Sequence, residues 1–100
     1  MIRRGTTPTH TITIPYDRVL VKDVRLSYAQ DGNEVIVKSI DDFSIEGQEY
    51  SVTLTQDETF SLEEGTVEIQ YRVLFGNGTV ASTDAITRSV YKSLNEEVLQ

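Results

Sequence analysis

The chain has 100 residues, 38% of them hydrophobic, which suits one domain with one hydrophobic core. It contains no cysteine, which excludes disulfide frameworks and thiolate metal sites. Sixteen acidic and nine basic residues give a formal net charge of −7, which argues against a nucleic-acid partner because phosphate contacts need clustered lysine and arginine. No apolar run approaches membrane-spanning length, so we expect no membrane insertion and synthesis in a cytoplasm.

The charge is unevenly distributed along the chain. Residues 1–40 carry six basic and four acidic side chains, whereas residues 41–100 carry three basic and twelve acidic ones. Ordinary solubilising charge is one explanation for this excess of acid. The other is electrostatic attraction between the basic part of one copy and the acidic part of its neighbour.

The first predicted elements are a strand, an irregular segment and a hairpin. Residues 9–14 alternate threonine with larger side chains, which is the period of a β-strand. Residues 16–22 place apolar groups on both sides of the chain, so we expect a connection or a β-bulge there. Alternation resumes over residues 24–28, and Asp31-Gly32 predicts a two-residue turn into a strand over residues 34–40.

The middle of the chain contains two short predicted strands and one helical turn. The strands span residues 43–45 and 49–55, and Gly47 permits a tight reversal between them. Thr55-Gln-Asp-Glu58 has the spacing of a helical capping box. It predicts a single helical turn that crosses from one sheet to the other.

The clearest alternation runs from Thr66 to Phe75. One face carries Val67, Ile69, Tyr71, Val73 and Phe75, and the other carries Thr66, Glu68, Gln70 and Arg72. This segment is therefore predicted to be a half-buried strand. Gly76-Asn77-Gly78 follows as a hairpin turn. A last strand is expected over residues 79–91, with the side chains of Val80, Ile86 and Val90 facing inward.

Short strands at hairpin spacing predict an all-β fold, namely an antiparallel immunoglobulin-like β-sandwich of about seven strands with one short helical turn. A small closed barrel is the alternative. The Cys…Trp…Cys pattern of antibody domains is absent from the sequence. We expect a sandwich domain over residues 9–92, an N-terminal arm over residues 1–8 that the sandwich does not need, and a C-terminal tail over residues 93–100.

The sequence offers no catalytic or metal-binding constellation. His10 is the only histidine, and it shares a strand face with Ile12 and Ile14, so we interpret it as a structural residue. Threonines flank His10 and the chain has no cysteine, so we expect neither a Ser/His/Asp nor a Cys/His arrangement. We therefore predict a non-enzyme that holds neither a metal nor another cofactor.

The two ends of the chain are the predicted contact regions. The arm is cationic through Arg3 and Arg4, whereas the tail is acidic and carries Leu94, Val98 and Leu99. Ends of opposite charge suit head-to-tail contact between copies or neighbours, which would make the chain a homo-oligomer or an assembly subunit. Frayed termini without a function are the alternative.

Four stretches of the sequence carry a resemblance to known proteins. They are Arg3-Arg-Gly-Thr-Thr-Pro-Thr-His-Thr-Ile-Thr-Ile-Pro-Tyr-Asp17, Val24-Arg-Leu-Ser-Tyr-Ala-Gln30, Thr53-Leu-Thr-Gln-Asp-Glu-Thr59 and Leu94-Asn-Glu-Glu-Val98. Together they resemble small proteins encoded in phages and prophages of Firmicutes, among virion structural genes. Many such proteins are similar to the immunoglobulin-like modules of phage tails, baseplates and capsids. The resemblance implies synthesis in the host bacterial cytoplasm and a structural or adaptor role in the virion.

Two hypotheses of function follow from these observations. In the first, the chain is an assembly component that binds copies of itself or other virion proteins. In the second, it is a recognition module that binds a glycan or a host surface protein through its loops. Glycan sites usually present aromatic side chains, but the chain has no tryptophan and Tyr16 is one of few tyrosines expected at the surface. The sequence therefore favours the assembly component.

Overall fold

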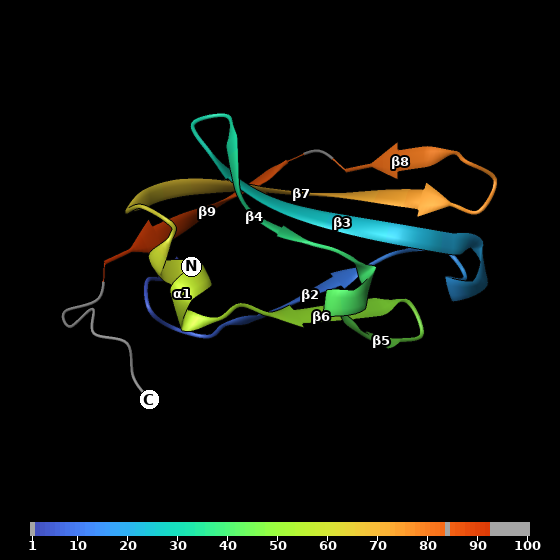
Figure 1. The fold of residues 1–100 in the computed structure, drawn as a ribbon, viewed down its shortest axis with the longest axis horizontal. Helices are drawn as coiled ribbons and strands as arrows, with labels where there is room; N and C mark the ends of the chain where they lie inside the picture. Colours follow the sequence, from blue (N-terminus) through green and yellow to red (C-terminus); the bar gives the residue numbers. More distant parts are fainter. Residues whose placement is uncertain (1, 84, 93–100) are drawn as a thin grey trace.

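The computed structural model describes residues 2–83 and 85–92 of the chain. Two β-sheets pack face to face, so the predicted all-β sandwich is confirmed (Figure 1). The described residues form nine strands, where about seven were expected. One of the two additional strands is a two-residue strand at one end of the larger sheet, and the other arises because the predicted last strand is divided in two.

The larger sheet has six strands in the order β1-β9-β7-β3-β4, and β8 also pairs with β7. Its strands are β1 (Ile2–Arg3), β3 (Val21–Gln30), β4 (Asn33–Lys38), β7 (Gly65–Phe75), β8 (Val80–Ser82) and β9 (Ile86–Tyr91). The pairs within this sheet are antiparallel except for β1 and β9, which run parallel.

The smaller sheet has three antiparallel strands in the order β2-β6-β5. Its strands are β2 (Thr9–Thr13), β5 (Ser44–Glu46) and β6 (Glu49–Thr53). Three helical elements connect the sheets, namely the 3-10 turns η1 (Arg18–Leu20) and η2 (Ile40–Asp42) and the helix α1 (Gln56–Phe60). The capping box predicted at Thr55 and Glu58 begins α1, because each side chain bonds to the backbone N–H of the other residue.

The core lies between the sheets and follows the predicted period of two. Along β7, Val67, Ile69 and Val73 are buried, and Tyr71 is half-buried against them. The buried side chains form two clusters, one around Tyr28 and one around Tyr50, and both tyrosines are fully buried. Removing this apolar surface from water is the main favourable contribution to folding.

Two of the predicted irregular segments have the expected geometry. Asp31 and Gly32 take φ values of 53° and 80°, so the turn between β3 and β4 has the left-handed conformation that a two-residue hairpin requires. The pairing of β3 with β7 shifts register between Val21 and Asp23. This shift is the bulge that the loss of alternation over residues 16–22 predicted.

The prediction of a separate N-terminal arm is wrong for the residues that the structure describes there. Ile2 is 1% exposed, and β1 pairs with Val90 and Tyr91 of β9. The backbone N–H of Gly5 donates to Thr59 Oγ1 at 3.0 Å. Two residues are too few to show an alternating pattern, so the sequence could not reveal that this segment completes the core.

The predicted last strand is divided into β8 and β9, which both pair with β7. Between them Thr83 donates its backbone N–H to the Tyr71 carbonyl at 3.1 Å and accepts a hydrogen bond from Gln70. Val90 is buried as expected, but Val80 and Ile86 are 48% and 49% exposed. The predicted inward placement is wrong for Val80, which pairs with Leu74 on the outer phase of β7. Ile86 pairs with the inward-facing Ile69, so its phase is as predicted, but no described strand of the smaller sheet covers it.

Candidate interaction surfaces

One long side of the sandwich is open between β2 of the smaller sheet and β9 of the larger one. β2 pairs only with β6, so its other edge has no strand partner among the described residues. β9 pairs with β7 on one edge, while on the other edge the described part of the chain pairs only at Val90 and Tyr91, with β1. Unpaired edges expose backbone donors and acceptors that can pair with another chain.

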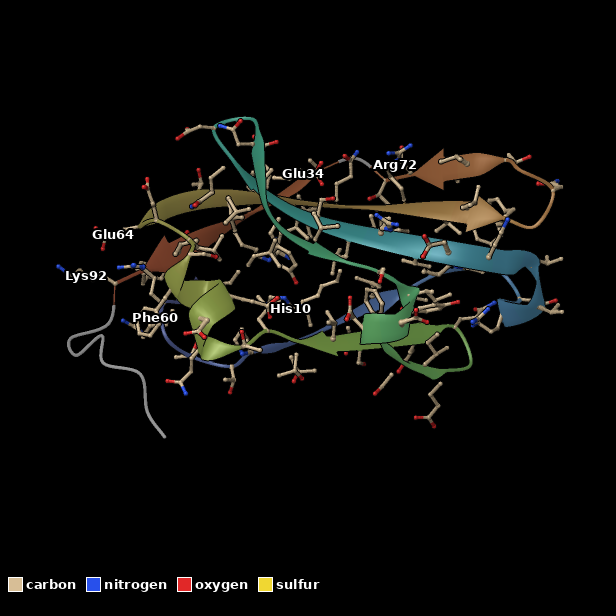
Figure 2. The ribbon with its side chains drawn as sticks, in the orientation of Figure 1. His10, Glu34, Phe60, Glu64, Arg72 and Lys92 are labelled. Carbon is tan, nitrogen blue, oxygen red and sulfur yellow. The ribbon has the colours of Figure 1, made fainter. Side chains whose placement is uncertain are left out.

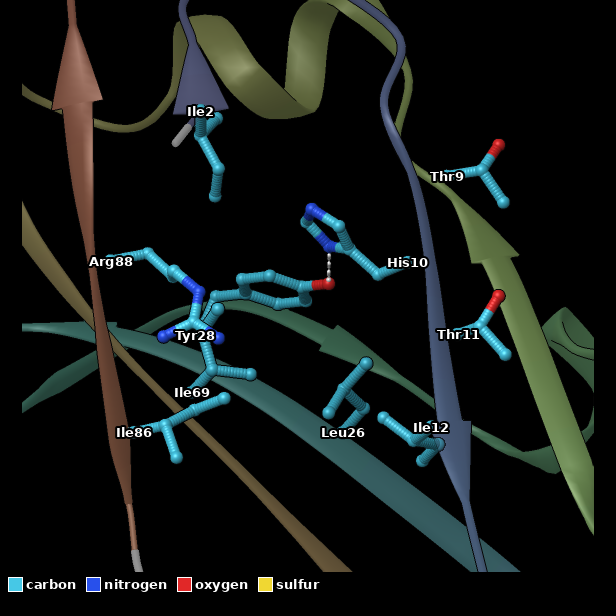
Figure 3. Close-up of a pocket in the computed structure, with 10 residues that line it drawn as sticks. All are labelled: Ile2, Thr9, His10, Thr11, Ile12, Leu26, Tyr28, Ile69, Ile86 and Arg88. Carbon is cyan, nitrogen blue, oxygen red and sulfur yellow. Dashed lines mark hydrogen bonds between the residues drawn. The ribbon is translucent and has the colours of Figure 1, made fainter.

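A groove enters the core on this side. It begins as a cavity of about 280 Å³ between β2 and β9 and continues into a second cavity of about 120 Å³. Ile12, Leu26, Ile69 and Ile86 line both cavities. The β2–β9 groove is therefore apolar along its floor, and Ile2 lines it near β1 (Figure 3).

His10 and Tyr28 form the polar centre of the groove. Their rings stack with centroids 5.6 Å apart, and His10 Nδ1 lies 2.5 Å from the Tyr28 hydroxyl. Burial lowers the pKa of His10 below its ordinary value of 6.5, and burial raises the pKa of Tyr28. Neutral His10 therefore accepts a hydrogen bond from Tyr28, which gives the buried hydroxyl the partner that it needs.

Arg88 contributes a positive charge to the same groove. It pairs in register with the buried Val67, so its side chain leaves β9 on the inward face. Figure 3 shows Arg88 on the opposite side of the groove from His10, with Tyr28 between them. An inward charge on an edge strand opposes indiscriminate pairing, and it also favours a partner with a carboxylate.

A second exposed surface is an apolar tip at the end of the sandwich formed by η1 and the β7–β8 turn. Val19 and Leu20 of η1 are 88% and 53% exposed, and together with Phe75 they line a hollow at this end. Tyr16, the predicted surface tyrosine, is 39% exposed and packs edge-on against Phe75 at 4.8 Å. A clustered apolar surface of this kind is typical of a contact site.

The structure does not bring the six residues predicted for interaction into one site. Arg3 is exposed and lies over the Tyr91 ring at 5.7 Å. Arg4 is half-buried and donates to the Phe60 carbonyl at 3.0 Å, so it holds the chain against α1. Tyr16 packs against Phe75 at the apolar tip, and the β7–β8 turn of this tip lies at the opposite end of the sandwich from α1 (Figure 1). Leu94, Val98 and Leu99 lie outside the described residues.

Sequence reasoning missed the groove, although one signal pointed to it. In β9, Arg88 has the same alternation phase as Ile86 and Val90. A charged residue on the inward phase of a strand indicates an edge or an opening. His10 on the inward phase of β2 is the matching signal in the other sheet.

Within residues 2–83 and 85–92, no cluster of three or more histidine, aspartate or glutamate side chains could hold a metal ion. Over the same residues, no helix is long and apolar enough to cross a membrane. No protein-family model, no curated protein and no solved structure matches the chain. The functional argument therefore rests on the geometry of the sandwich.

Proposed function

We propose that the chain is a non-enzymatic structural or adaptor subunit of a phage virion, in the tail, baseplate or capsid, that acts through protein–protein contacts. The open side between β2 and β9 carries this proposal, because it offers unpaired strand edges above an apolar groove. Strand addition at such an edge is a general mode of protein recognition. Its partners are other virion proteins or copies of this chain.

The order of the strands supports the immunoglobulin-like part of the proposal. The neighbours β9-β7-β3-β4 and β2-β6-β5 follow the order G-F-C-C′ and B-E-D of an immunoglobulin sandwich. In that assignment the first strand lies beside the last one, as β1 lies beside β9. This first strand has only two residues here, which leaves most of the β9 edge free.

The test is whether the chain belongs to the particle of the phage that encodes it. Particles are purified on a density gradient, washed at about 0.5 M salt to weaken contacts made by charge alone, and probed with an antibody. We expect the chain to remain with the particles. A chain that is absent from the particles, and is also monomeric at high concentration, would refute the assembly role.

The apolar tip supports the second candidate, a module that recognises a glycan or a host protein. Tyr16 is exposed there beside Val19 and Leu20, and an aromatic ring supported by Phe75 suits stacking on a sugar. Binding of the purified chain to a glycan panel, lost in Tyr16→Ala and kept in Tyr91→Ala, would favour this candidate. We expect no such binding.

A further inference from the structure

The β2–β9 groove has the form of a site for one missing strand. One edge of β2 pairs with no described strand over its five residues, which is about 17 Å at the rise of a β-strand. The outer edge of β9 pairs with no described strand from Ile86 to Ser89. An extended segment placed between them would bond to a strand edge and cover the side chains of Ile12 and Ile86.

The chemistry of the groove changes from apolar to cationic and back along its length. Figure 3 shows Ile2 at one end, His10 and Arg88 in the middle, and Ile12 and Ile86 at the other end. A matching strand would therefore present an apolar, an acidic and an apolar side chain at alternate positions. The strand would need an acidic side chain at its centre because, among the described residues, no carboxylate pairs with Arg88.

The last eight residues of the chain have this pattern. In an extended conformation Leu94, Glu96 and Val98 share one face, because alternate residues of a strand point the same way. Eight extended residues span about 26 Å, which exceeds the length of the free β2 edge. We propose that the β2–β9 groove binds the C-terminal segment 93–100 of a second copy, with Glu96 beside Arg88 and with Leu94 and Val98 on the apolar ends.

The position of Lys92, where the described chain ends after β9, favours the tail of a second copy over the chain's own tail as the occupant of the groove. A direct hairpin after β9 would pair with the edge at Val90 and Tyr91, where β1 already lies. Both backbone groups of Lys92 are also held at this end, since its N–H donates to Glu64 at 3.4 Å and its carbonyl accepts from Arg3 at 3.1 Å. Figure 2 shows Lys92 and Glu64 together at one end of the sandwich, away from His10.

This inference rests on the proposed assembly role and specifies its contact. Each copy would offer one groove and one tail, so the contact is heterologous and produces a head-to-tail series. The closing strand would then come from the neighbour, as in donor-strand complementation.

The test uses full-length variants in analytical ultracentrifugation over a wide concentration range. Arg88→Glu disables the groove and Val98→Asp disables the tail, so each should associate at least tenfold more weakly than the wild type. Arg72→Glu, an exposed arginine on the outer face of β7, and Leu99→Asp, on the other phase of the tail, are the matched controls and should associate like the wild type. Thermal melts establish that all four variants fold.

Mixing distinguishes a contact between copies from a general effect of charge. Arg88→Glu retains its tail and Val98→Asp retains its groove, so an equimolar mixture should form a 1:1 dimer and no larger species. The double variant Arg88→Glu/Glu96→Arg reverses both charges and should recover association. Equal association of Arg88→Glu and Arg72→Glu, or a mixture that stays monomeric, would overturn the inference.

Failure of this inference and failure of the assembly role give different results. If the wild type associates or remains with virions and Arg88→Glu does so equally, the groove is not the contact, but the assembly role stands. If the wild type is monomeric but remains with virions, the second copy is excluded and another virion protein is the partner. A monomer that is absent from virions refutes both.

Discussion

The two long sides of the sandwich are closed in different ways. On one side the chain itself crosses between the sheets, from β4 through η2 to β5 (Figure 1). Ile36 is 4% exposed there, Ile40 and Phe43 pack on the core, and Lys38 Nζ lies 2.6 Å from a Glu58 carboxylate oxygen. On the other side no described segment runs along β2 and β9, so inward side chains remain open to solvent.

The difference shows that the core is covered on the side where a chain segment crosses between the two sheets. The hydrophobic pattern of the strands alone does not determine which side is covered. Both sides have apolar residues on the inward phase, Ile36 on one and Ile86 on the other. Ile36 is buried in a core cluster against which Phe43, the residue after η2, also packs. Ile86 has no such cover from the described residues and is 49% exposed. We infer that the open side is completed from outside the chain.

The largest expected difference in stability is between two variants that each place an aspartate at an inward position, one on each long side of the sandwich. Ile36→Asp buries a carboxylate without a cationic partner and should cost more than about 4 kcal/mol, enough to unfold a domain of this size. Ile86→Asp leaves the carboxylate half-exposed beside Arg88 and should cost less than about 1 kcal/mol. Urea unfolding measures both variants, and equal losses would show that the two sides are not different.

The N-terminal strand tests how much of the open side the chain closes by itself. Ile2→Ala should cost about 2–4 kcal/mol, because it removes a buried side chain and leaves a cavity beside β9. Thr7→Ala, at an exposed position before β2, is the control and should cost less than about 0.5 kcal/mol. A loss for Ile2→Ala as small as that of the control would restore the original prediction of a dispensable arm.

The two buried tyrosines give a smaller contrast. The Tyr28 hydroxyl bonds to His10 on the open side, so Tyr28→Phe should cost about 1 kcal/mol. The Tyr50 hydroxyl is buried with no hydrogen-bond partner among the described residues, so Tyr50→Phe should be neutral or stabilising by up to about 1 kcal/mol. Chemical denaturation of both variants checks the sign, and a clear loss in Tyr50→Phe would contradict this account.

The smallest expected effect is on the pH dependence of stability. His10 on the open side and Glu58 on the closed side should lose their contributions to the free energy of unfolding in different pH ranges. The folded pKa of His10 lies below 6.5, chiefly through burial, so the unfolded chain binds its proton first and stability falls as the pH drops below about 6.5. Burial by itself would raise the pKa of Glu58, but hydrogen bonds from Lys38 and Thr55 outweigh it, and the pKa lies below 4.5. The contribution of Glu58 is therefore present above pH 4.5 and is lost as the pH falls through its folded value.

Single variants separate the two pH ranges. His10→Gln should flatten the stability profile below pH 6.5 and leave the loss below pH 4.5 in place. Glu58→Gln should do the reverse, and its loss at neutral pH should stay small because the Lys38 pair is partly exposed. Melting temperatures measured from pH 7 to pH 3 would show this, and identical profiles for both variants would refute the assignment.

The sequence was sufficient to locate a secondary-structure element where the signal for that element lies in neighbouring residues. Alternation located β7, Asp31-Gly32 located a hairpin, and the Thr55/Glu58 spacing located α1. The sequence was not sufficient to predict whether a side chain is buried where that burial depends on a segment far away in the chain. Ile2 is buried by β9 and Ile86 is left exposed because β2 lies too far away to cover it, and neither outcome can be inferred from the neighbouring residues. The groove is the same kind of non-local feature, although Arg88 on an inward phase was a readable sign of it.

Amide hydrogen exchange tests the central claim most directly, because it reports on both sides of the sandwich in one experiment. The wild-type chain is compared at low and high concentration. Our account predicts new protection at the free edges of β2 and β9, over residues 9–13 and 86–89, with no change along β4. Protection that appears on β4 instead, or edges of β2 and β9 that exchange equally at all concentrations, would contradict it.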